Sequence, residues 1–188
     1  ETIHPIIPEF RHTYARQQIP FQYSAHLMNS PFDSPSHYDY IGNGTDDPRL
    51  ELIQSLLKNI PENACILVYN EEFEKKVIHE LTLAFPEFEQ DLMKRYHNIK
   101  DLMIPFKERY YYSYKMEGRY SIKKVLPLLC PNLNYNHLDI QEGLTASKTY
   151  YNLKNIKSSE EQTLIKQQLL EYCKLDTYAM IEILKQFN

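Results

Sequence analysis

The sequence predicts an α/β fold in which a mixed sheet is flanked by helices. Short runs of β-branched and aromatic residues come first, and later apolar runs alternate with segments of helical periodicity. The chain has 188 residues, 43% of them hydrophobic, which is enough for one domain with a core but small for two. We therefore interpret residues 1–188 as a single domain.

The first half of the chain contains most of the predicted strands. Residues 19–28 and 37–41 have the composition of strands, and the link over residues 29–36 contains two prolines. Gly42-Asn43-Gly44 is a turn sequence that ends the second strand. Asp46-Asp47-Pro48 then opens a helix, with proline just inside it. Its expected core positions at helical spacing are Leu50, Ile53, Leu57 and Ile60.

The rest of the chain is predicted to be mainly helical. Residues 64–69 are a short apolar run typical of a buried strand, and residues 99–103 are a second short strand. Residues 107–120 are an irregular connection rich in tyrosine. Helices are expected over residues 71–85, 86–96, 121–129, 141–153 and 159–186, the last with Ser159 and Gln162 as a capping pair.

Composition narrows the class of protein. No apolar run approaches the ~20 residues that a membrane span requires, so we expect no membrane partner. The three cysteines, Cys65, Cys130 and Cys173, have no metal-type spacing, and their odd number predicts reduced thiols in a cytoplasmic protein. The net charge of -4 argues against a broad DNA-coating surface, although it leaves room for a local nucleic-acid groove.

Acidic side chains occur at three places in the sequence where they could form a catalytic or metal-binding site. Tyr172 and Asp176 are four residues apart in a predicted helix, so the phenol and the carboxylate share one face. Glu74 follows a buried strand at the start of a helix, where open α/β sheets place ligands, although the helix dipole alone also favours an acidic residue there. Glu1 is the third. Carboxylates bind hard divalent cations, and a nearby phenol can position water.

These three places resemble the motifs of a known class of nuclease. Glu1-Thr2, Tyr69-Asn70-x-x-Phe73-Glu74 and Tyr172-x-x-x-Asp176 are similar to the three motifs of DEDD-type 3′–5′ exonucleases of the tyrosine subtype. Over nearly its whole length the chain is similar to an uncharacterised bacterial domain family related to those nucleases. The stretches that carry this wider similarity are residues 19–24, Asp47-Pro48-Arg49, residues 121–127 and Tyr172-Cys173.

The resemblance implies a ribonuclease H-like fold and a metal-dependent exonuclease. It implies that Glu1, Glu74 and Asp176 are catalytic metal ligands for Mg²⁺ or Mn²⁺, and that Tyr172 orients the attacking water. Two ions are expected when the first motif is completed by an Asp two residues upstream of Glu1. Glu74 stands where the motif normally has Asp. Asp101 is similar to a further acidic position, and a carboxylate at a strand end or turn is the alternative interpretation.

The expected substrate is the end of a single-stranded DNA or RNA. The residues assigned to substrate binding are Thr2, Asn70, Arg109, Tyr111 and Lys115. Cations alternate with tyrosines between residues 107 and 120, and aromatic rings stack on bases while cations hold phosphates. A tyrosine-rich loop packed over the edge of the domain is the alternative interpretation of this segment.

Two other functions stay open from the sequence. One is a catalytically degenerate domain that binds nucleic acid or docks a protein, which Glu74 and the acidic net charge favour. The other is a phosphodiesterase for small oligonucleotides. The chain starts at the end of the strand that carries the first motif, so we expect the central first strand to be largely missing. We therefore expect an N-terminally truncated domain that is part of a longer polypeptide and is less stable alone.

Overall fold

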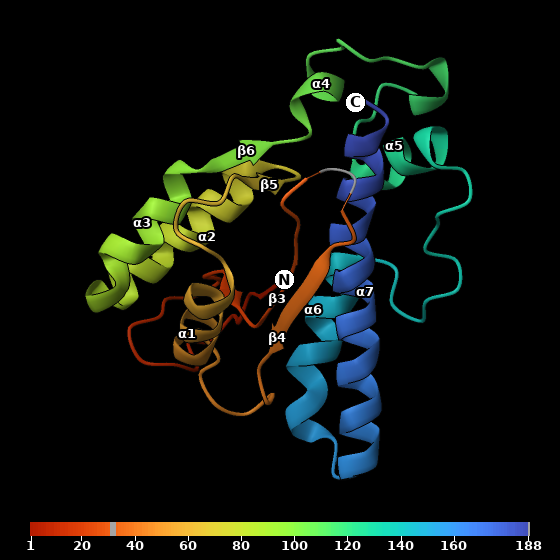
Figure 1. Ribbon diagram of the computed structural model, residues 1–188. Helices are drawn as coiled ribbons and strands as arrows, with labels where there is room; N and C mark the ends of the chain where they lie inside the picture. The colour runs from red at the N-terminus through yellow and green to blue at the C-terminus, as the bar shows by residue number, and fades with distance from the viewer. Residues whose placement is uncertain (31–32, 188) are drawn as a thin grey trace.

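The computed structural model describes residues 1–30 and 33–187 and has a mixed α/β architecture (Figure 1). Its strands are β1 (Thr2–Ile3), β2 (Ile19–Pro20), β3 (Gln22–Leu27), β4 (Ser36–Ile41), β5 (Ile66–Val68) and β6 (Ile99–Asp101). The pairs β1–β2 and β3–β4 are antiparallel, and β5–β6 is parallel. The predicted strands therefore form, although part of the predicted link over residues 29–36 lies outside the described residues.

The strands do not assemble into the single mixed sheet that we expected. Those in the described part of the chain pair two by two, in three separate two-stranded sheets. The β3–β4 pair is a local hairpin with His26 opposite His37, whereas parallel β5 and β6 need the long connection that α2 and α3 provide. Helix α7 packs against β3, β4 and β5, so a helix rather than further strand pairing connects these sheets.

Seven α-helices occur in the described ranges. Their bounds are α1 (Arg49–Asn59), α2 (Glu71–Ala84), α3 (Glu89–His97), α4 (Ile104–Lys107), α5 (Ile122–Leu129), α6 (Gly143–Asn152) and α7 (Ser159–Lys185). Short 3-10 turns are η1 (Pro86–Phe88), η2 (Tyr114–Met116) and η3 (Leu153–Asn155). Figure 1 shows α6 beside the N-terminal half of the long α7, while α2 and α3 lie together on the other side of β3 and β4. No helix in the described ranges is both long and apolar enough to cross a membrane.

Two details of the helices differ from the prediction. In α1, Leu50 is 40% exposed, and the core positions are Leu52 and Ile53, because the tertiary neighbours of the helix cover a different part of its surface. In α7 the N-cap is Ser158 rather than Ser159, and its hydroxyl accepts a hydrogen bond from the Glu161 amide. The segment predicted to be irregular also contains the end of α4 and the turn η2.

Hydrophobic residues gather in two clusters. The larger one lies among β1, β2, α5, α6 and α7, and Phe21 stacks on Tyr150 within it at a ring separation of 3.9 Å. The smaller one joins α1, α2 and α3 to β5 and β6 through Ile53 and Leu92, among others. The candidate residues Glu74 and Asp176 come from elements of different clusters, on α2 and α7 respectively.

Candidate active site

Helix α7 carries the phenol and the carboxylate that the sequence singles out. Tyr172 is only 3% exposed, and Asp176, one turn further, is half-buried. The loop between α5 and α6 adds a second phenol, because the Tyr135 hydroxyl donates a 2.6 Å hydrogen bond to Asp176 Oδ1. Asp176 is thus a carboxylate held in place by its surroundings.

Burial and mutual contact shift the pKa values of Asp176, Tyr135 and Tyr172. Burial raises the pKa of Asp176, while hydrogen bonds from Tyr135 and Tyr172 oppose the rise by favouring the ionised form. Burial also raises the pKa of both phenols, and the charge of Asp176 raises it further. Tyr135 and Tyr172 therefore stay protonated at neutral pH and act as hydrogen-bond donors or acceptors.

Glu74 lies in the first turn of α2, after β5, as its sequence position predicts. Its Oε2 atom is sealed from solvent and has no hydrogen-bond partner among the described residues. Burial raises the pKa of this carboxyl to about 7, and the charges of Asp101 and Glu1 add to the rise. A buried, unpaired carboxylate oxygen is costly unless a proton or a cation satisfies it.

Glu1 connects the two halves of the candidate site. Its charge raises the pKa of Glu74 on α2 and also that of Asp176 on α7, so it lies within electrostatic range of both. Its carboxylate faces the start of α6, where a Cβ added to Gly143 would lie 3.3 Å from Glu1 Oε2. Backbone hydrogen bonds to Phe21 and Gln22 fix the main chain of Glu1 beside β2 and β3.

Asp101 ends β6 and is engaged with the backbone. Its Oδ1 accepts hydrogen bonds from the amides of Asn70 and Met103 at 2.9 and 2.8 Å, and its Oδ2 accepts one from the Glu71 amide at 3.1 Å. The bonds from Asn70 and Glu71 satisfy free N–H groups at the start of α2, and the bond from Met103 satisfies one at the start of α4. This geometry fits the alternative interpretation of Asp101 as a strand-end carboxylate.

The carboxylates suit a hard cation by their chemistry. Mg²⁺ is commonly held by one or two carboxylates together with waters and substrate phosphate, and the unpaired Glu74 Oε2 fits such a role. Glu1, Glu74 and Asp176 nevertheless do not form a ready-made cage. Among the residues that the structure describes, no group of three His, Cys, Asp or Glu side chains is placed so that it could hold a metal ion.

The two substrate-binding candidates from the motifs lie in structured positions. The Thr2 side chain is buried, and its hydroxyl is 2.9 Å from His4 Nε2. Asn70 precedes α2 with a φ of 88°, a left-handed conformation that asparagine tolerates better than most residues. Asn70 is exposed and lies directly before the first turn of α2, which carries Glu74.

The other three substrate-binding candidates lie on residues 107–120. Arg109 and Lys115 are exposed, whereas Tyr111 is half-buried and its ring packs edge-on against Phe106 and Phe187. Four tyrosines of this segment are exposed, with values of 82, 56, 79 and 39% for Tyr110, Tyr112, Tyr114 and Tyr120. The segment thus offers open aromatic surface as well as cations, while Tyr111 anchors it to the core.

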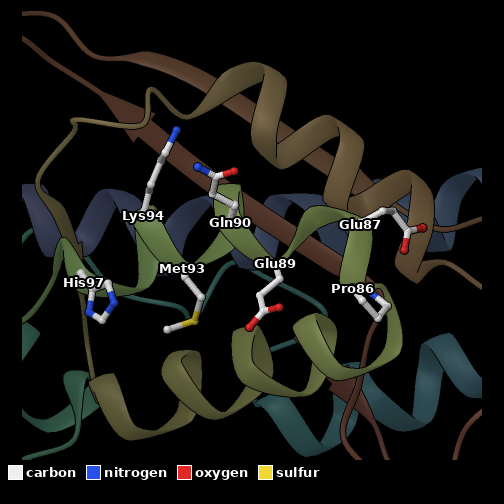
Figure 2. A pocket seen from close by; sticks show the side chains of 7 residues that line it. All are labelled: Pro86, Glu87, Glu89, Gln90, Met93, Lys94 and His97. Carbon is white, nitrogen blue, oxygen red and sulfur yellow. The ribbon is translucent and has the colours of Figure 1, made fainter.

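Two surface hollows in the described part of the chain are lined by other residues. One of about 500 Å³ follows η1 and α3, and its lining includes Glu87, Met93 and His97 (Figure 2). Another is lined by His137, Lys174 and other residues of α7 and of the loop between α5 and α6. Neither contains a residue that the sequence assigned to the site.

The sequence did not indicate two residues that contact the Tyr172–Asp176 pair. Tyr135 and Lys123 are not among the site residues that the sequence assigned. In the structure the Lys123 ammonium lies 3.4 Å from the Tyr172 hydroxyl and 5.4 Å from the centre of the Tyr135 ring. Only chain folding brings these residues to α7, and no local sequence pattern marks either one.

The sequence matches one protein-family model. Residues 1–121 match the family described as "Domain of unknown function (DUF2779)", and the chain belongs to it. No curated protein and no solved structure matches the chain.

Proposed function

We propose that this domain hydrolyses phosphodiester bonds with divalent cations, as a ribonuclease H-like 3′–5′ exonuclease acting on the ends of single-stranded DNA or RNA. One observation carries the proposal. The Tyr172–Asp176 pair on α7 and the Glu74 carboxyl on α2, whose Oε2 has no hydrogen-bond partner among the described residues, both lie within electrostatic range of a third carboxylate, Glu1. Carboxylates gathered in this way repel one another, and a cation relieves that repulsion.

Each side chain has a defined role in this proposal. Glu1, Glu74 and Asp176 would hold the cations, which supply hydroxide near neutral pH and stabilise charge on the attacking and leaving oxygens. The Tyr172 hydroxyl would position the attacking water. Its raised pKa supports this role, because the phenol keeps its proton and orients water without ionising. Tyr135 would hold Asp176 in a fixed orientation through its hydrogen bond.

The surface around residues 107–120 supports the proposed substrate class. The exposed rings of Tyr110, Tyr112 and Tyr114 can stack on unpaired bases, and Arg109 and Lys115 can contact the phosphates between them. The net charge of -4 fits a local contact of this kind better than a surface that coats a duplex.

The direct test is digestion of a 5′-labelled single-stranded oligonucleotide. With Mn²⁺ we expect stepwise shortening from the 3′ end, and with chelator none. Asp176→Asn should abolish most of the cleavage, whereas Tyr172→Phe should slow turnover about 10–100-fold with Mn²⁺ affinity largely kept. Asp91→Asn on α3 is the matched control, since Asp91 is exposed and forms a surface ion pair with Lys94. Full chelator-sensitive cleavage by Asp176→Asn would rule out its role as a ligand.

A second candidate is a degenerate domain that binds nucleic acid without cutting it. The lack of a ready three-ligand group among the described residues favours it. It predicts that the labelled oligonucleotide is retained in a gel-shift assay and stays intact with Mn²⁺. Cleavage of a dinucleotide but not of the oligonucleotide would instead identify a phosphodiesterase for small oligonucleotides.

A further inference from the structure

Lys123 is the cation that faces the phenol–carboxylate cluster. Its ammonium lies over the rings of Tyr135 and Tyr172, at 5.4 and 5.2 Å from their centres. It also donates to the Gln141 carbonyl and lies 3.4 Å from the Tyr172 hydroxyl. Its positive charge lowers the pKa of Asp176, which places that carboxylate in its field. Three separate segments thus converge on one ammonium.

The neighbouring lysine provides a contrast on the same helix. Lys124 pairs with Glu117 at 2.9 Å, in an ordinary surface salt bridge. Lys123 makes no salt bridge within the described part of the chain, and its neighbours are a carbonyl and two phenols. The loss of hydration of this partly buried lysine is therefore offset only at longer range, by the charge of Asp176.

The ammonium also has hydrogen-bonding capacity to spare. A lysine has three N–H donors, and the Gln141 carbonyl and the Tyr172 hydroxyl use two of them. If Asp176 is committed to a cation, as in the proposed function, its charge no longer compensates Lys123. An incoming anion at this place would then meet one free N–H and one positive charge.

We propose that Lys123 forms a subsite for the phosphate group of a nucleotide. The inference rests on the proposed hydrolase for the identity of the ligand, because a phosphodiester substrate and a nucleoside monophosphate product both carry such a group. Tyr135 and Tyr172 hold the ammonium in place through their ring faces. Lys123 binds the non-bridging oxygens of the phosphate.

The test compares the binding of adenosine 5′-monophosphate with that of adenosine, by calorimetry, in EDTA and in Mg²⁺. Wild type should bind the monophosphate at least about tenfold more tightly than adenosine. Lys123→Met should remove this difference and leave adenosine binding unchanged, and Lys123→Arg should restore part of it. Lys124→Met, one residue away, should behave as wild type. Urea unfolding of each variant verifies that the fold is kept.

The outcomes separate this subsite from the proposed hydrolase. Loss of phosphate-dependent binding in Lys123→Met supports the subsite even when the oligonucleotide is not cleaved. Equal affinities of Lys123→Met and Lys124→Met for the monophosphate overturn it, even when wild type is an active nuclease. A wild type that binds adenosine and its monophosphate equally in both conditions also overturns it. If Lys123→Met fails to fold, Lys123→Gln replaces it in the same comparison with Lys124→Met.

Discussion

Replacing Glu74 by Gln should stabilise the protein at alkaline pH in the absence of divalent cations. The folded-state pKa of Glu74 is raised from 4.5 to about 7, chiefly by burial. The folded carboxyl therefore holds its proton more tightly than the unfolded one, and the free energy of unfolding falls as the pH rises from 4.5 to 7. At 1.36 kcal/mol per pH unit, the free energy of unfolding of wild type falls by about 3 kcal/mol. The Gln variant does not lose this stability, because its amide does not ionise.

The assay is urea unfolding of wild type and Glu74→Gln in EDTA, at pH 4.5 and pH 8. The two proteins should differ little at pH 4.5, and the variant should be more stable by about 3 kcal/mol at pH 8. For a chain of this length that corresponds to a rise in Tm of roughly 6–12 °C. Taking the variant-minus-wild-type difference cancels the contributions of other titrating groups.

Glu72→Gln is the matched control for this experiment. Glu72 lies in the same helical turn, but its side chain is 83% exposed, and it forms an ion pair with Lys107 at 3.9 Å. Its replacement should change stability by less than about 0.5 kcal/mol at either pH. If Glu74→Gln were no more stable than Glu72→Gln at pH 8, Glu74 would not be buried as an uncompensated carboxyl. The reasoning from its burial would then be refuted.

Three further perturbations test other parts of the structure. Tyr135→Phe removes the 2.6 Å hydrogen bond to Asp176 and should cost about 1.5–3 kcal/mol at pH 8, measured by urea unfolding; a neutral change would contradict that bond. Gly42→Ala places a Cβ 2.3 Å from the Tyr150 hydroxyl and should lower Tm through about 1–3 kcal/mol of overpacking; an unchanged Tm would contradict this close approach. The pKa of His26 is lowered to about 4 by burial, so its contribution to stability is present above pH 6.5 and lost as the pH falls toward 4. His26 is only partly buried, so the loss relative to His26→Asn should be only about 1–2 kcal/mol, and identical pH profiles would refute it.

The sequence by itself determined where the elements lie. The helix predicted over residues 71–85 is α2 (Glu71–Ala84), and the one predicted over residues 121–129 is α5 (Ile122–Leu129). Breaks at proline and asparagine and the helical spacing of apolar residues are local properties, so they are readable without a fold. The spacing of Tyr172 and Asp176 also placed both groups within one turn of α7 for the same local reason.

The tertiary structure decided which groups surround Tyr172 and Asp176. Tyr135 reaches Asp176 across 41 residues of sequence, and Lys123 reaches Tyr172 across 49, so no local pattern could indicate either contact. The exposure of Leu50, the pairing of strands in twos and the backbone bonds of Asp101 also depend on distant neighbours. Periodicity selects a face of a helix, but burial, charge and hydrogen-bond partners arise only when elements remote in sequence pack together.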